Sequence, residues 1–268
     1  MPKFSIEVRF MGGLNAAQQA AFSNAAKRWA QVVIGDFPSV NVDGEVINAL
    51  VIEASGKDID GEGNILGQSS PTVVLPNGLP AKGFMEFDTS DLAEMENDGT
   101  LGSVILHEMG HVLGIGSIWR DKHDLVGART ANPRFVGRQA DAEWVKLSAL
   151  APRSLPVENH GGAGTRNSHW RETVFGNELM TGFLSGDAQP LSRLTIASLA
   201  DLGYEVDFSA ADPFILPSHL EIRAMGVGAD PELVRRCTMS SRPQRRITPK
   251  RLGPESLAAR RKNSETKP

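Results

Sequence analysis

The sequence predicts an α+β fold, and three observations indicate this class. Apolar and polar residues alternate over residues 4–10, as in a strand with one buried face. Three more short apolar stretches, at residues 46–53, 72–75 and 83–87, are bounded by turn-forming residues. Longer segments with helical spacing lie between and after these strands, as expected where helices cover a sheet.

Four segments carry helical signals. Asn15, with Gln18 three residues later, forms a capping-box pattern, and the apolar residues that follow share one side as far as the stop signal at Gly35. The other predicted helices span residues 100–113, 140–150 and 191–202.

Composition excludes several classes of protein. Of the 268 residues, 40% are hydrophobic and 22% are charged, as in an ordinary globular protein. No apolar run is long enough to span a membrane, and no cleavable secretory signal is visible at the N-terminus. Cys237 is the single cysteine, which rules out an internal disulfide and a cysteine-rich zinc site. Any metal must therefore be held by carboxylates and the six histidines.

Charge is distributed unevenly along the chain. From Arg235 onward there are 11 Lys and Arg residues against Glu255 and Glu265, a net +9, which leaves −13 for the remainder. We expect a domain at residues 1–212, with an upper part at about 1–116 and a lower part at about 117–212. Residues 213–268 are expected to be a basic extension, disordered after residue 235. Such a tail could contact an anionic surface, although solvation alone is the commoner role of a charged tail.

The segment from His107 to His111 carries the chemistry. Two histidines four residues apart on a helix differ by about 40° around its axis, so both imidazoles can reach one ion. Glu108 projects beside that ion and can take a proton from a zinc-activated water. The alternative is a pair of core histidines. Glu108 argues against it, because an unpaired buried carboxylate is costly.

Residues 107–114 resemble the HExxHxxG start of the metzincin peptidases, in which the glycine turns the chain out of the helix. Most metzincins place a third histidine three residues after that glycine, where this chain has Ser117. The candidates further on are His123, His160 and His169, while His219 lies beyond the expected domain. Residues 168–172 and 177–182 resemble the leishmanolysin-like metzincins, which have a long insertion before the third histidine.

This resemblance covers residues 4–206 and implies a set of roles. His107, His111 and His169 would bind Zn²⁺, with 57 residues between the last two. Glu108 would be the general base, and Met180 the methionine of the turn beneath the metal. The implied fold is a twisted mixed sheet with two long helices above a cleft, and an irregular lower subdomain with one helix. An extracellular zinc endopeptidase acting on polypeptides would follow.

The chain departs from these families at several positions. Some metzincins have a tyrosine two residues after the turn methionine, where this chain has Gly182, and its single tyrosine is Tyr204. Leishmanolysins are also rich in cysteine and membrane-anchored, whereas this sequence has one cysteine and we expect no membrane span in it. His123 and His160 are expected in exposed loops.

A second metal is suggested by a resemblance to the calcium loop of the matrixins. It implies Ca²⁺ ligands that combine carboxylates with loop carbonyls, namely Asp60, Gly61, Gly63, Ile65, Asp88 and Asp91. The alternative is a glycine-rich hairpin loop with a helix-capping aspartate. The matrixins' neighbouring structural zinc is not expected, because Gln68 and Glu86 stand where histidines would be needed.

Two alternatives to this function remain open. One is a peptidase whose third zinc ligand is a carboxylate such as Glu143. The other is a zinc-stabilised binding module that does not catalyse a reaction. For the peptidase, we expect substrate to pair with the strand at residues 83–87. The sequence does not predict the oligomeric state.

Overall fold

The computed structural model describes residues 3–63, 65–148, 154–162, 164–184, 188–224 and 247–257. Its main sheet has the order β1 (Ile6–Phe10), β4 (Leu50–Lys57), β6 (Pro80–Asp88), β5 (Gly67–Val74) and β10 (Lys250–Arg251). Strands β1, β4 and β6 are parallel, β5 is antiparallel to β6, and β10 is parallel to β5. The sheet is therefore mixed, as expected.

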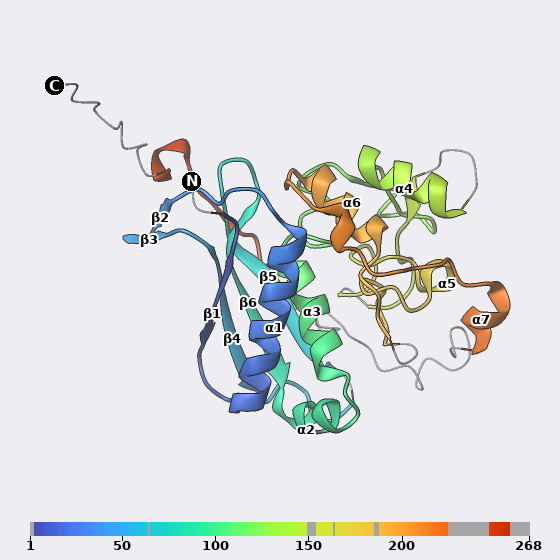
Figure 1. The fold of residues 1–268 in the computed structure, drawn as a ribbon, viewed down its shortest axis with the longest axis horizontal. Helices are drawn as coiled ribbons and strands as arrows, with labels where there is room; N and C mark the ends of the chain where they lie inside the picture. Colours follow the sequence, from blue (N-terminus) through green and yellow to red (C-terminus); the bar gives the residue numbers. More distant parts are fainter. Residues whose placement is uncertain are drawn as a thin grey trace.

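Helices α1 (Ala16–Val32) and α3 (Leu101–Val112) lie side by side on one face of this sheet (Figure 1). The predicted capping box is present at the start of α1, where the Asn15 side chain accepts from Gln18 N and the Gln18 side chain accepts from Asn15 N. Helix α1 fully buries Phe22 and Trp29, and the Trp29 indole donates to Leu106 O at 3.0 Å. This contact joins the two helices.

The upper part differs from the prediction in three ways. The single strand expected at residues 46–53 is divided into β3 (Glu45–Ile47) and β4, and β3 forms a hairpin with β2 (Val40–Val42). The hairpin turn uses Asp43 and Gly44, both at positive φ. Helix α2 (Thr89–Asn97) was not among the four predicted helices, although a helix-capping aspartate was one interpretation of this segment. Asp88 caps it by accepting from Ser90 N.

The chain after α3 forms an irregular region. It contains the short strands β7 (Leu125–Val126), β8 (Arg134–Phe135) and β9 (Leu155–Pro156), with helices α4 (Arg138–Ser148), α5 (Glu172–Phe175) and α6 (Arg193–Leu202) and the turn η1 (Phe208–Ala210). Helices α4 and α6 confirm the predicted helices at residues 140–150 and 191–202, so this region contains more than the one helix that the family resemblance implied. A buried aromatic cluster of Trp119, Phe135 and Trp170 forms its centre.

The C-terminal extension contains ordered structure. After α7 (His219–Ala224), the described residues resume at 247 and form β10 and the turn η2 (Pro254–Ser256). Leu252 is 7% exposed and its N–H donates to Val74 O at 2.9 Å, while Lys250 forms an ion pair with Asp43. The prediction of disorder after residue 235 is therefore wrong for residues 247–257. The rest of that segment, with Cys237, lies outside the described residues.

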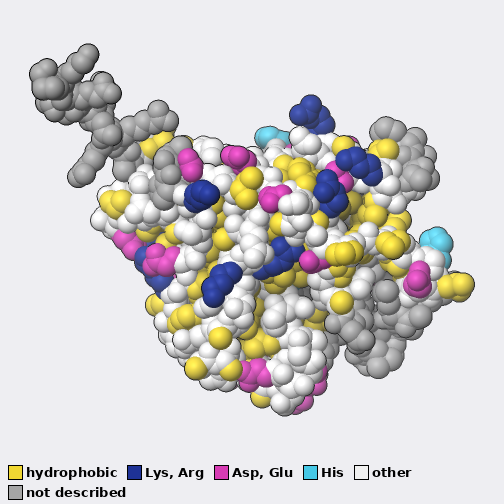
Figure 2. All heavy atoms as spheres, in the orientation of Figure 1, with side chains coloured by type: hydrophobic (Ala, Val, Ile, Leu, Met, Phe, Trp, Pro, Cys, Tyr) yellow, Lys and Arg dark blue, Asp and Glu magenta, His cyan; other side chains and the backbone are white. Residues whose placement is uncertain are grey.

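Within the described residues, no helix has the length and hydropathy needed to cross a membrane. On the face shown in Figure 2, Lys and Arg side chains are interspersed with Asp and Glu.

Candidate metal centre

His107 and His111 lie one turn apart on α3, where both side chains are buried at 3% and 0% exposure. Helix α3 is buried along most of its length because it packs against both α1 and the sheet. It ends at Val112, Leu113 is its C-cap, and Gly114 follows at a φ of 114°. The turn that the sequence predicts at Gly114 is therefore present.

His169 reaches this pair from the irregular region. Its segment passes close to the chain that leaves α3, at Gly116, which has a φ of 72°. A Cβ on Gly116 would overlap the carbonyl oxygen of Ser168. Glycine at this position therefore allows the chain carrying His169 to approach the end of α3.

The three imidazoles form a compact triangle of nitrogen atoms. The Nε2···Nε2 distances are 2.9 Å for His107 and His111, 3.0 Å for His111 and His169, and 3.1 Å for His107 and His169. A tetrahedral zinc ion about 2.0–2.1 Å from each nitrogen would place them about 3.3 Å apart. The triangle is close to that size.

The opposite ring nitrogens determine the tautomers. The Nδ1 atoms of His107, His111 and His169 lie 2.6, 2.8 and 2.9 Å from the carbonyl oxygens of Leu179, Ile115 and Thr165. A carbonyl can only accept, so each Nδ1 carries the proton and each neutral Nε2 presents a lone pair. Three lone pairs facing one another at about 3 Å repel without a cation between them. This donor set fits a zinc ion.

The electrostatic surroundings keep these rings neutral. Burial, with a smaller contribution from His111, lowers the pKa of His107 to about 3. Burial also lowers the pKa of His111 and holds that of His169 well below its usual value. Because metal ligation requires neutral imidazole, these shifts prepare all three rings for an ion.

Glu108 lies next to the triangle and is fully buried. Its carboxylate oxygen Oε2 accepts a hydrogen bond from Ser69 Oγ at 2.6 Å. Ser69 belongs to β5, and sequence reasoning did not select it. A serine in a strand carries no signal of its own that would link it to a glutamate 39 residues later.

Met180 directly follows Leu179, whose carbonyl oxygen contacts His107 Nδ1. Its N–H donates to Glu178 Oε2 at 2.7 Å, and its carbonyl accepts from Trp170 N at 2.9 Å. Its sulfur packs closely against α3, because a Cβ on Gly110 would lie 2.8 Å from Met180 Sδ. The thioether therefore forms a floor beneath the histidine helix, consistent with packing and not with metal ligation.

Glu178 organises this turn and was not predicted as an important side chain. Besides Met180 N, it accepts from the hydroxyls of Ser192 at 2.6 Å and Thr195 at 2.5 Å. Burial raises its pKa, and these hydrogen bonds act in the opposite direction. The carboxylate ties the turn beneath the metal centre to the start of α6.

Comparisons with known proteins agree with this geometry. A family model described as Leishmanolysin matches residues 50–220, which include all three histidines, Glu108 and Met180. The chain belongs to the leishmanolysin family. It is 29% identical to Leishmanolysin of Leishmania donovani and 28% identical to Leishmanolysin of Leishmania major, in each case over 58% of this chain and 27% of the relative.

A vertebrate protein also matches this leishmanolysin-family chain. The Ciliated left-right organizer metallopeptidase of Xenopus laevis is 26% identical over 48% of the chain and 21% of its own length. The chain thus spans about a quarter of the length of the curated relatives it matches.

The other histidines of this leishmanolysin-family chain do not join the triangle. His123, His160 and His219 are exposed. Among the described residues, His107, His111 and His169 form the group of three or more His, Cys, Asp or Glu side chains that could hold an ion.

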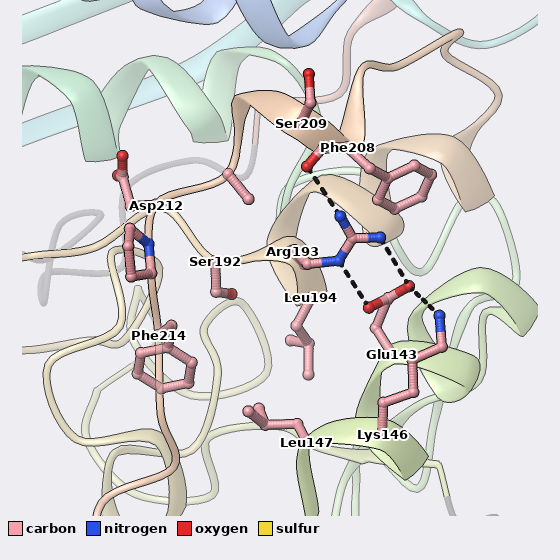
Figure 3. A pocket seen from close by; sticks show the side chains of 12 residues that line it. Glu143, Lys146, Leu147, Ser192, Arg193, Leu194, Phe208, Ser209, Asp212 and Phe214 are labelled. Carbon is pink, nitrogen blue, oxygen red and sulfur yellow. Dashed lines mark hydrogen bonds and ion pairs between the residues drawn. The ribbon is translucent and has the colours of Figure 1, made fainter.

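Glu143 is engaged away from the histidines (Figure 3). Its carboxylate oxygens form ion pairs with Lys146 at 2.7 Å and Arg193 at 3.1 Å, on the wall of a pocket of about 530 Å³ between α4 and α6. Burial acts to raise the pKa of Glu143, but the two basic partners lower it overall. These contacts argue against Glu143 as a zinc ligand.

Tyr204 does not replace the tyrosine missing at Gly182. Its hydroxyl donates to Leu113 O at 2.9 Å, and burial raises its pKa strongly. Tyr204 therefore anchors the end of α3.

The predicted calcium loop is held by its own amides. Asp88 Oδ2 accepts from the N–H groups of Ile59, Asp60 and Gly61 at 3.1, 2.8 and 3.0 Å, and these contacts lower its pKa against the effect of burial. Asp91 Oδ1 accepts from Gly63 N at 2.7 Å, and Asp60 Oδ1 from Ile65 N at 3.2 Å. This arrangement matches the alternative of a loop with a capping aspartate, and calcium binding stays a prediction. Gln68 and Glu86, which stand where a second zinc would need histidines, contact each other: the Gln68 amide donates to Glu86 Oε2 at 2.7 Å.

Proposed function

We propose that this chain is a zinc-dependent endopeptidase. His107, His111 and His169 hold the zinc ion, and Glu108 is the general base. The observation that carries the proposal is the convergence of three neutral Nε2 atoms beside a buried carboxylate, supported by membership of the leishmanolysin family.

Each residue has a separate task in this proposal. The backbone carbonyls of Leu179, Ile115 and Thr165 fix the ring orientations, so that the ligand geometry is set before the metal binds. When bound, zinc activates a water molecule and polarises the substrate carbonyl. Glu108 takes the proton of the attacking water at its carboxylate and returns it to the leaving amine.

The substrate strand is reassigned from the sequence-based expectation. Residues 83–87 belong to β6, which lies between β4 and β5, so β6 offers no free edge. Strand β5 contacts Glu108 through Ser69. Within the described part of the chain, the outer edge of β5 pairs with β10 at Val73 and Val74. We propose that a polypeptide substrate pairs with β5 on the Glu108 side of this contact.

The decisive experiment compares zinc content and casein cleavage in three proteins. We expect Glu108→Ala to retain zinc and lose cleavage, and His169→Ala to lose both. His160→Ala is the matched control, because this histidine is exposed and should leave both properties unchanged. Full activity in Glu108→Ala would refute the assigned base.

Two other outcomes are distinguishable. Loss of zinc in Glu143→Gln, with zinc retained in His169→Ala, would favour the carboxylate-ligand peptidase. Zinc binding by all forms with no cleavage of any unfolded protein would favour a binding module. We also propose an extracellular location from the family membership, and detection of the native protein only inside cells would contradict it.

A further inference from the structure

Two residues of β5 lie against the side chain of Glu108. Gly67 and Ser69 are two positions apart and therefore on the same face of the strand. A Cβ on Gly67 would lie 3.0 Å from Phe87 Cε1, which is tight, and 3.4 Å from Glu108 Cγ, which is ordinary contact, so the strand backbone at Gly67 lies close to both side chains. Ser69 lies beyond it and reaches the carboxylate. Strand β5 thus packs against the Glu108 side chain at Gly67 and binds its carboxylate at Ser69.

The Ser69 hydroxyl lies within hydrogen-bond distance of two oxygens of Glu108 and donates its single proton to either one or shares it between them. Its hydroxyl oxygen lies 2.6 Å from Glu108 Oε2 and 2.8 Å from the Glu108 backbone carbonyl oxygen. Ser69 is 2% exposed, and it is opposite buried Met85 in the register of β5 with β6. A buried donor on the sheet therefore restricts the rotamers of a side chain on α3.

We propose that Ser69 is a positioning residue that holds the Glu108 carboxylate in its catalytic orientation. This inference rests on the proposed function, because it assigns Ser69 a part in the same reaction. Ser69 acts through Glu108 and needs no contact with the substrate or the metal. Its hydrogen bond selects one orientation of the carboxylate before the reaction begins, which reduces the reorganisation that the reaction requires.

The first test uses kinetics of the zinc-loaded protein on an unstructured peptide. We expect Ser69→Ala to lower kcat about 10- to 100-fold, the effect of losing a hydrogen bond to a charged group, with KM within about twofold of wild type. Zinc content should be unchanged. Ser69→Thr retains the hydroxyl and should restore most of kcat.

The matched control is Ser198→Ala. Ser198 is also fully buried and donates to a backbone carbonyl, Thr195 O at 2.7 Å, but it belongs to α6. It should leave kcat near the wild-type value. An unchanged kcat in Ser69→Ala, or no recovery in a folded, zinc-loaded Ser69→Thr protein, would overturn the proposal.

A second test does not depend on activity. In zinc-free protein, urea unfolding of wild type, Ser69→Ala, Glu108→Ala and the double variant forms a double-mutant cycle. We expect Ser69→Ala to shift the midpoint at least twice as far in the wild-type background as in Glu108→Ala. Equal shifts would overturn the positioning role. If the chain proves to have no peptidase activity, the proposed function fails, and this cycle still decides whether Ser69 and Glu108 are coupled.

Discussion

The zinc-free protein should lose stability as the pH falls below about 6.5, because burial disfavours the charged form of the three clustered histidines in the folded state. Burial lowers the pKa of His107 to about 3, against an ordinary value of 6.5. Between these two values, protons bind the unfolded chain more readily than the folded one. The contribution of neutral His107 to the free energy of unfolding is therefore present above pH 6.5 and is lost progressively as the pH falls toward 3.

The size of the effect follows from the shift. For His107 alone, with a folded pKa of about 3, the loss is about 0.8 kcal/mol at pH 6 and about 1.4 kcal/mol at pH 5.5. His111 and His169 act in the same direction. Asp124 opposes them, because burial and nearby Asp201 raise its pKa to about 6. A difference between matched variants removes that contribution.

The assay is urea unfolding of chelator-treated protein at pH values from 8 to 5.5, for wild type and His107→Asn. Asp124 titrates in both proteins, so the difference in pH dependence reports His107. We expect wild type to lose about 1.4 kcal/mol more than the variant over this range. The control His160→Asn changes an exposed histidine and should follow wild type. Parallel curves for wild type and His107→Asn would refute the reasoning.

Three further outcomes are expected. Gly116→Ala should weaken zinc binding at least tenfold by chelator competition, because its Cβ would displace the Ser168 carbonyl next to His169; unchanged affinity would contradict this. If the loop containing Asp60 binds calcium, millimolar Ca²⁺ should raise the melting temperature at constant zinc, and an unchanged value with or without EGTA would contradict that prediction. Leu252→Ala should lower the melting temperature by several degrees, because it removes a buried side chain that helps hold residues 247–257 to the sheet; exposed Leu220→Ala is its control, and equal melting curves would show that the contact adds no stability.

Local spacing was enough to predict one side of the metal centre. The helix that carries His107, Glu108 and His111 depends on contacts within about four residues, which the order of residues expresses directly. The capping box at Asn15 belongs to the same class. His169 was different. Spacing left it as one of three candidates, and only the family resemblance selected it before the structure placed it beside the pair.

Contacts between segments that are distant in sequence could not be predicted from local spacing. Ser69 and Glu178 are ordinary polar residues in sequence, and their roles arise because the strand and the turn that carry them meet α3 and α6. The substrate strand was misassigned for the same reason, since apolar alternation identifies strands but not their order in a sheet.

The sequence by itself thus determined the α+β class, the histidine helix and the place of Glu108, the proposed general base, within that helix, because periodic local interactions encode them. The tertiary structure decided how the third histidine closes the site, which strand lies beside Glu108, and that residues 247–257 join the sheet. Those features depend on pairing between residues tens to hundreds of positions apart, which local propensity does not specify.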